Sequence, residues 1–311
     1  MRAEYSEYTS LLPIMEIEVK PVPFFIIFIL ISIICCIDVP LNGIVIWLLG
    51  FRIKRNPFTV LILNLAIADF GFLLFLAISC IYYFIVRMSQ GITLFTNFWI
   101  HIGWLTRIMY INSLFLLTAI SIDRCVCVLF PIWHRCSRPK RLSSAVCAFL
   151  WILSVLLEGI QNILNYVFYY DDFLNISLIV TYVLCLPLIT ASTVILFVKI
   201  CIKPKQMKRG RLLVMILIIL LCFLIFNLPL NIYGFSIAYD RYFYRSFSFN
   251  WYMNLGASLN SSVNPIIYYL VGRKKQAQTR ESIKVVFQRV FREDEAPEST
   301  ENATNRVSTS L

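Results

Sequence analysis

Charged residues are scarce in this chain of 311 residues, where Asp, Glu, Lys and Arg together make up only 14%. Hydrophobic residues reach 59%, and the mean hydropathy is +0.76, which is far above that of soluble globular domains. These values exclude an ordinary water-soluble fold. The chain needs a lipid bilayer around it.

Patterns typical of enzymes and transporters are also missing. The chain has only two histidines, His101 and His134, and no GxSxG, HExxH or paired aspartates at catalytic spacing. We therefore expect no enzyme and no catalytic residues. A multi-span transporter or channel remains the alternative, although the sequence shows no inverted repeat and no matching pair of broken helices.

Long apolar runs are abundant instead. A helix needs about 20 apolar residues to cross a hydrocarbon core of ~30 Å. None of the runs alternates as a membrane β-barrel strand would, so each is predicted to be a helix that satisfies its own backbone. Seven runs are long enough, at 24–50, 58–86, 97–122, 142–168, 174–198, 212–238 and 248–271. The predicted fold class is an all-α membrane protein with a seven-transmembrane helix bundle over residues 24–271.

Basic residues gather on alternate connections between these runs. Lysine and arginine number 21 in the segments 51–57, 124–141, 199–211 and 273–292, against 5 in the other connections and residues 1–23. By the positive-inside rule the first set is cytoplasmic, so residues 1–23 are extracellular and the carboxyl terminus is cytoplasmic. We expect a multi-pass protein of the plasma membrane. Nucleic-acid binding is the weaker interpretation of the net charge of +11.

A signal peptide and extracellular cysteines are two further absences. Residues 1–23 have no basic start and no cleavage site, so we expect the first span to act as its own insertion signal. Each of the ten cysteines falls in a predicted span or on the cytoplasmic side. Free thiols are therefore favoured over a structural disulfide.

Polar side chains inside the predicted spans are few and informative, because a polar group in hydrocarbon is costly. Three spans carry a set that we expect to meet in the bundle interior: Asn42, Asn64, Asp69 and Asn264. Asp69 is the one formal charge of this set. An oxygen-rich pocket suited to a small cation or a shared proton would combine Asp69, Ser113, Asn260, Ser261 and Asn264. A packing network without an ion is the alternative.

The stretch ISIDRC places an acid and a base side by side where the third span leaves the bilayer. We expect Arg124 to project between the cytoplasmic ends of the helices. A buried guanidinium there needs a partner, which is either the adjacent Asp123 or a protein that enters from below. The pair is therefore a candidate switch.

Several short motifs occur together in an order that resembles one known family, the rhodopsin-like G-protein-coupled receptors. They are LNGIV (41–45), NLAIADF (64–70), ISIDRC (120–125), Trp151, Pro187, Asn227-Leu228-Pro229 and NSSVNPIIYYLVG (260–272). Finer stretches such as FRIKRNPFTV (51–60) and FLIFNLP (223–229) resemble the Mas-related receptors within that family.

This resemblance implies roles for residues that match the family's motifs. Asp69, Ser113, Asn260, Ser261 and Asn264 match its sodium pocket, with Na⁺ as an allosteric ion and no other cofactor. Arg124 matches the arginine that meets the heterotrimeric G protein, while Pro265 and Tyr268 match a helix break and a switch tyrosine. The resemblance implies an extracellular peptide or small cationic ligand, and coupling to Gq and Gi.

Departures from the family's pattern carry expectations of their own. Trp99 stands where most relatives have a cysteine that tethers an extracellular loop, and Asn227 replaces the usual toggle tryptophan. Arg209 stands where some relatives have an acid that locks Arg124. Because two arginines repel, we expect a weak inactive-state lock and high ligand-free signalling.

Candidate ligand-binding residues lie toward the extracellular side. Arg107 is 16 residues from Asp123, a rise of about 24 Å, and Glu158 is 16 residues from Leu142, so the two share a depth and can pair. They either form a structural ion pair or hold a charged group of a ligand. Asp38 is expected to bond groups of the seventh span. The remaining candidates are Asp171, Asp172 and Asn227 for ligand binding and Asn175 for glycosylation.

The chain beyond the bundle is predicted to have two parts. Residues 272–292 form an amphipathic cytoplasmic helix with Ile283, Val286, Phe287, Val290 and Phe291 on its apolar face. Residues 293–311 are polar and acidic, which is typical of a disordered cytoplasmic tail. Phosphorylation of that tail would recruit arrestin, and the final Leu311 fits a PDZ ligand.

Overall fold

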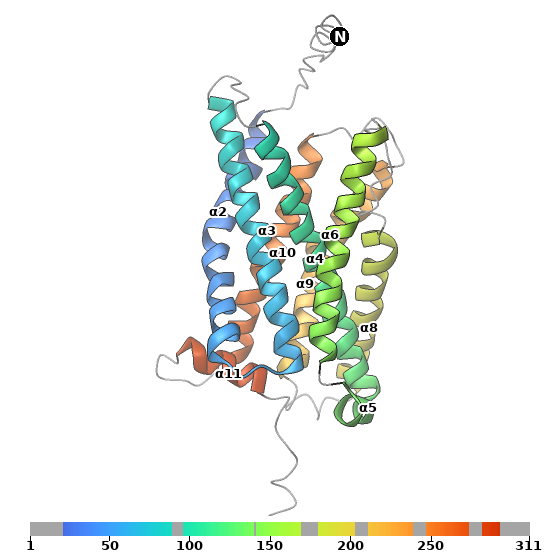
Figure 1. Cartoon of the computed structure of the whole chain (residues 1–311). Helices are drawn as coiled ribbons and strands as arrows, with labels where there is room; N and C mark the ends of the chain where they lie inside the picture. Colours follow the sequence, from blue (N-terminus) through green and yellow to red (C-terminus); the bar gives the residue numbers. More distant parts are fainter. Residues whose placement is uncertain are drawn as a thin grey trace, which may run out of the picture.

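A computed structural model describes residues 21–88, 96–139, 141–168, 180–202, 211–238, 247–273 and 282–292. Seven long helices run up and down side by side (Figure 1). They are α2 (Pro21–Trp47), α3 (Pro57–Met88), α4 (Thr96–Leu129), α6 (Leu142–Phe168), α8 (Leu186–Ile202), α9 (Arg211–Ala238) and α10 (Phe247–Gly272). The described residues contain no strand, so the predicted all-α bundle is confirmed.

Shorter elements extend or join these helices. Two π-helical turns, η1 (Leu48–Arg52) and η2 (Thr181–Cys185), continue α2 and precede α8, and α5 (Pro131–Cys136) follows α4. The last helix, α11 (Ile283–Arg292), crosses under one end of the bundle, the end where α5 also lies (Figure 1). We call this end the basic end, because the described parts of the predicted basic connections lie here, including residues 51–57, 124–139, 199–202 and 282–292.

Six helices of the described chain are long and apolar enough to cross a membrane. The seventh, α10, is 26 residues long but is not among them. Four consecutive turns of α10 carry amide and hydroxyl side chains, and Asn260, Ser261, Ser262 and Asn264 are all buried. Ser261, Ser262 and Asn264 bond side chains of other helices, so the low hydropathy does not prevent α10 from spanning.

The predicted ends of the spans shift at two places. Helix α4 continues to Leu129, so Asp123 and Arg124 lie within it and are followed by a little more than one helical turn. This agrees with the predicted last turn before Pro131. Helix α8 runs on to Ile202, four residues beyond the predicted end, while residues 174–179 of that predicted span lie outside the described residues.

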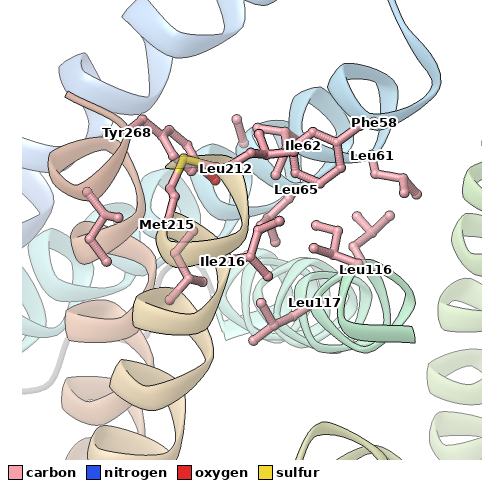
Figure 2. Close-up of a cluster of buried hydrophobic side chains, with 14 of the residues drawn as sticks. Phe58, Leu61, Ile62, Leu65, Leu116, Leu117, Leu212, Met215, Ile216 and Tyr268 are labelled. Carbon is pink, nitrogen blue, oxygen red and sulfur yellow. The ribbon is translucent and has the colours of Figure 1, made fainter. Parts of the chain in front are cut away.

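The largest buried cluster fills the half of the bundle next to the basic end. Leucine and isoleucine side chains of α3, α4 and α9 pack around Tyr268 and Met215 (Figure 2). Lipid tails are as apolar as these side chains. The helix contacts are therefore stabilised by close packing and not by the exclusion of water. Substitutions that open a void here should therefore loosen the helices around Arg124.

Helix α11 packs onto the bundle with its apolar face. Of the predicted apolar face, Val286, Phe287, Val290 and Phe291 are buried and Ile283 is 45% exposed. Ile283 is the first residue of α11 and lies on the same helical face as these four residues, in agreement with the predicted apolar face. The ring of Tyr268 lies 6.2 Å from that of Phe287 and 5.9 Å from that of Phe291. The helix is thus fixed to α10 by aromatic contacts.

A glycine makes the approach of α11 possible. A Cβ atom at Gly272 would lie 2.5 Å from the carbonyl oxygen of Val286 and 2.8 Å from Cγ2 of Val290. Since the first of these is backbone, the neighbour cannot rotate away. We expect Gly272→Ala to lower the free energy of unfolding in detergent by about 1–3 kcal/mol, measured from thermal melts of the full chain.

The control for this prediction is Gly159→Ala in α6. A Cβ atom at Gly159 meets nothing within 4 Å, so this variant should melt at or slightly above the wild-type temperature. Equal melting of the two variants would show that α11 is not held by the close approach at Gly272.

Candidate functional site

Asp69 of α3 is the centre of a polar site in the middle of the bundle. Its Oδ1 atom accepts hydrogen bonds from the hydroxyls of Ser113 at 2.7 Å and Ser261 at 2.9 Å. Its Oδ2 atom accepts a bond from Nδ2 of Asn264 at 2.8 Å. Asp69 is fully buried. Three helices, α3, α4 and α10, therefore meet at one carboxylate, as the sequence predicted for these four residues.

Asn260 completes the predicted set in a different way. It is buried, yet it makes no hydrogen bond to Asp69, and its Oδ1 atom has no partner among the described residues. An amide oxygen without a donor in a buried position favours an additional electropositive group. The Asp69 carboxylate and the hydroxyls of Ser113 and Ser261 are oxygen ligands of the kind that fit a small hard cation.

Two members of the predicted cluster do not join Asp69. Asn42 donates to the carbonyl oxygen of Asp38 in its own helix at 3.2 Å. Asn64 donates to the Val60 carbonyl at 2.8 Å and accepts a bond from the Trp151 indole at 3.1 Å. The prediction that these amides meet Asp69 is wrong, because an asparagine can bond the carbonyl four residues earlier.

Asp38 lies on α2 and faces α10. The hydroxyl of Ser262 lies within hydrogen-bonding distance of its Oδ2 atom and, at 2.6 Å, of the carbonyl oxygen of Ser258, and its single hydrogen can be donated to one of them at a time. Both Asp38 and Ser262 are buried. The predicted bond between Asp38 and a seventh-span hydroxyl is confirmed, and Asp38 has a structural role that links α2 to α10.

Arg124 is buried at the basic end of α4. Its Nε and Nη2 atoms lie 3.1 and 2.5 Å from Oδ2 of Asp123, so the adjacent acid is its partner, as predicted. The guanidinium also lies over the ring of Phe58, with 4.3 Å between the guanidinium carbon and the ring centroid. An ion pair and a cation–π contact thus hold this charge inside the bundle.

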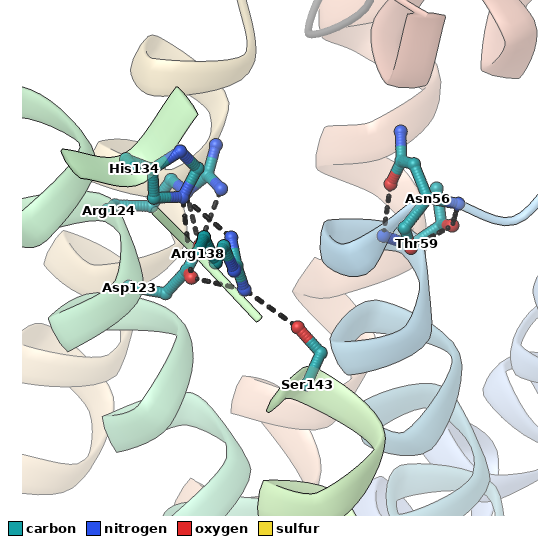
Figure 3. Close-up of polar contacts among 7 residues, drawn as sticks. All are labelled: Asn56, Thr59, Asp123, Arg124, His134, Arg138 and Ser143. Carbon is teal, nitrogen blue, oxygen red and sulfur yellow. Dashed lines mark hydrogen bonds and ion pairs between the residues drawn. The ribbon is translucent and has the colours of Figure 1, made fainter. Parts of the chain in front are cut away.

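The other oxygen of Asp123 binds residues outside α4. Nη2 of Arg138 lies 2.8 Å from Asp123 Oδ1 and donates to the Ser143 hydroxyl at 2.7 Å (Figure 3). Nη1 of Arg138 lies 2.6 Å from Nε2 of His134, and this nitrogen is 3.7 Å from Asp123 Oδ1. We call Asp123, Arg124, His134 and Arg138 the charged cluster.

His134 and Arg138 were missed by sequence reasoning. They stand 11 and 15 residues after Asp123. The path of the chain through α5 brings them back, and no spacing rule fixes that path. The sequence offered one indication of this contact, namely that both residues belong to the short basic connection that follows Asp123.

Arg209 lies outside the described residues, so its predicted repulsion of Arg124 stays a prediction. Pro265 lies within α10, one turn before Tyr268. Tyr268 is buried, and its hydroxyl has no hydrogen-bond partner among the described residues. Its ring is packed by α11, so movement of the ring requires movement of α11 or α10.

Toward the opposite end of the bundle, Arg107 of α4 pairs with Glu158 of α6. Nε of Arg107 lies 3.2 Å from Oε2 of Glu158, which confirms that the two residues share a depth. Nη2 of Arg107 also donates to Asn162 at 3.4 Å, a contact that the sequence did not indicate. The side chain of Glu158 is 1% exposed and that of Arg107 50% exposed. The arginine therefore keeps one side open to a further group.

Asn227 of α9 is buried, and its Nδ2 atom has no partner among the described residues. The remaining predictions on the extracellular side concern Asp171, Asp172 and Asn175, which lie outside the described residues, as do residues 293–311. All ten cysteines are described, and all are free, so the prediction of free thiols is confirmed.

Comparison with known proteins agrees with this arrangement. The chain matches the family model for "7 transmembrane receptor (rhodopsin family)" over residues 41–268 and belongs to that family. Receptors of this family are not enzymes, in line with the missing catalytic motifs.

Particular relatives narrow the assignment to the Mas-related G-protein-coupled receptors. The chain is 36% identical to Proto-oncogene Mas of Rattus norvegicus over 280 residues, covering 86% of this chain and 84% of the relative. It is 36% identical to Mas-related G-protein coupled receptor member D of Macaca fascicularis over 281 residues, covering 85% and 84%. For member H of Mus musculus the identity is 34% over 292 residues, covering 88% and 85%.

Proposed function

We propose that this receptor binds an extracellular short peptide and activates heterotrimeric G proteins of the Gq and Gi classes at the cytoplasmic face of the plasma membrane. The observation that carries the proposal is the buried Arg124, which is held by one acid at the basic end. The basic end is the cytoplasmic end in this proposal, in keeping with its lysines and arginines.

Activation requires Arg124 to become available to the G protein. Asp123 holds Arg124 through Oδ2 and Arg138 through Oδ1. Both arginines compete for a single carboxylate, so a shift of α5 that strengthens one pair weakens the other. A ligand favours the active state only to the extent that it binds that state more tightly. The repulsion expected between Arg209 and Arg124 would raise activity without ligand.

The ligand site that we propose lies at the end of the bundle opposite the charged cluster. The exposed side of Arg107 would bind an acidic group of the peptide, while Glu158 keeps the guanidinium in place. Asn227 offers an unpartnered amide deeper in the bundle. Asp171 and Asp172 would attract a basic peptide or a small cationic ligand to the mouth, and Asn175 would carry the glycan.

Sodium would be held by Asp69, Ser113, Asn260 and Ser261, with Asn264 orienting the carboxylate. A bound Na⁺ supplies positive charge next to Asp69 and ties α3, α4 and α10 together. Expulsion of the ion would free these helices to rearrange, so the ion is an allosteric stabiliser of the inactive state in this proposal.

Signalling would end through the cytoplasmic tail. We propose that phosphorylation of its serines and threonines recruits arrestin, and that the residues ending in Leu311 bind a PDZ domain through strand addition. Anionic lipids would contact the basic end.

The test of the proposed function is G-protein activation in transfected cells, without ligand and with a panel of peptides, at matched surface expression. The wild type should signal above mock cells, and Arg124→Ala should reduce that signal to the mock level. Ile163→Ala, an exposed position on α6 far from Arg124, serves as the control and should behave as the wild type. If the wild type activates no G protein under any condition, the result would favour a transporter or channel over a receptor.

A further inference from the structure

A cavity of about 450 Å³ lies between α4, α6 and α8. Its walls are mostly apolar and include Phe115, Ala119, Ile122, Val146, Phe149 and Leu188. None of these residues belongs to the Asp69 site or to the proposed ligand site. The volume is within the range of small-molecule sites in proteins.

The cavity opens to the outside of the bundle rather than to its interior. Three residues that line it are substantially exposed, namely Ile122 at 41%, Phe149 at 61% and Leu184 at 52%. A cavity enclosed by the bundle would be lined by buried side chains. In a bilayer this opening faces lipid, so the occupant enters from the membrane.

Charged side chains line one end of the cavity, whereas Thr118 is a polar residue nearer the other end. The charged end, which is the basic end of the bundle (Figure 3), is lined by Asp123, His134, Arg138 and Ser143. Asp123, Arg124 and Arg138 together carry a formal charge of +1. The cavity therefore has an apolar length and a cationic end.

Arg138 retains hydrogen-bonding capacity in this arrangement. A guanidinium has five N–H donors, and Arg138 uses three of them toward Asp123, His134 and Ser143. The other two have no partner among the described residues. These two are Nε–H and one N–H of Nη1, which lie on different edges of the guanidinium, so each can donate one charge-assisted hydrogen bond to a phosphate oxygen.

The length of the cavity fits one leaflet of a membrane. From Phe115 to Val126 along α4 the rise is about 16 Å, and half of a hydrocarbon core of ~30 Å is about 15 Å. An acyl chain anchored at the basic end would therefore end near the middle of the bilayer, where Phe115 lies.

We propose that this cavity binds one anionic phospholipid of the adjacent leaflet, with an acyl chain along α4 and the phosphate at Arg138. Basic residues near a membrane attract anionic lipid without a specific place, at about 1 kcal/mol each. The cavity adds a fixed site for one acyl chain. We therefore expect one lipid to bind per receptor, with an affinity that depends on the side chains lining the cavity.

Native mass spectrometry of the purified, delipidated receptor tests this site. The receptor is titrated with phosphatidylglycerol and, separately, with phosphatidylcholine of the same chains. We expect one phosphatidylglycerol to bind with at least about tenfold higher affinity than phosphatidylcholine. Ala119→Phe, which fills the cavity, should weaken the first binding event about tenfold, and Arg138→Gln should remove the preference for the anionic lipid.

Ala148→Phe is the matched control, because Ala148 is exposed on α6 and does not line the cavity. If Ala119→Phe does not fold, Val146→Phe fills the same cavity from α6. Equal binding of the two lipids, or unchanged binding in both cavity-filling variants, would overturn the proposal. The readout needs no signalling, so its failure is distinct from failure of the proposed function.

Discussion

Replacing Asp69 by alanine is expected to lower the thermal stability of the receptor more than any other single change in the polar interior. The change leaves the donors of Ser113, Ser261 and Asn264 without their acceptor in a buried place. An unsatisfied buried donor costs about 1–3 kcal/mol. The two hydroxyls can rotate toward a carbonyl of their own helix, so we expect a total loss of about 3 kcal/mol. Thermal melts in detergent and surface expression measure it.

Asp69→Asn separates the hydrogen bonds from the charge. The asparagine keeps an oxygen for the two serines, and a flip of Asn264 restores the third bond. This variant should therefore remain folded with a much smaller loss of stability. A melting temperature as low as that of Asp69→Ala would mean that the charge itself holds the helices.

The same variants test the sodium site. Sodium chloride should raise the melting temperature of the wild type above that in N-methylglucamine chloride at equal ionic strength, because an ion that binds only the folded state stabilises it. Asp69→Asn should lose this difference. Asn260→Ala should weaken it as well, although Asn260 makes no bond to Asp69. An unchanged sodium response in Asn260→Ala would favour a packing network without an ion.

Removing one charge of the pair between Arg107 and Glu158 should have unequal consequences. Arg107→Gln leaves a carboxylate that is almost completely buried without its counter-charge, and breaking a buried pair costs about 3–5 kcal/mol. Because Arg107 is half exposed, we expect a smaller loss of about 2 kcal/mol. Glu158→Gln leaves an arginine that is half exposed, so its cost should stay below about 1 kcal/mol.

The double variant distinguishes an ion pair from two independent effects. Arg107→Gln with Glu158→Gln should be more stable than Arg107→Gln alone, since no buried charge is left. Additive losses in this cycle would contradict the pair. A peptide agonist that loses potency on the stable double variant would support the ligand-binding role of Arg107, whereas unchanged potency would assign the pair to structure.

Contacts that depend on depth in a straight helix could be predicted from the sequence. Counting residues from Asp123 and Leu142 placed Arg107 and Glu158 at the same level, and they pair. Asp123 was predicted as the partner of Arg124 because the two residues are adjacent in the sequence, and the two side chains do pair. Helix rise and chain adjacency are fixed by covalent geometry, so such predictions do not need the tertiary structure.

Contacts that depend on a turn or on local competition could not be predicted. The bond between Arg138 and Asp123 requires the chain to reverse through α5. Asn64 had both a helix carbonyl and Trp151 within reach, and spacing does not say which group an amide will choose.

The free cysteines give the native chain attachment points for spectroscopic labels. Cys36, Cys136 and Cys201 are the exposed ones. A maleimide reacts with the thiolate, which forms in water and not among lipid tails. Cys36 lies midway along α2 and so faces lipid, whereas Cys136 ends α5 and Cys201 is next to the last residue of α8. A donor and an acceptor dye on these two thiols would report their separation as the receptor is activated, without engineered cysteines.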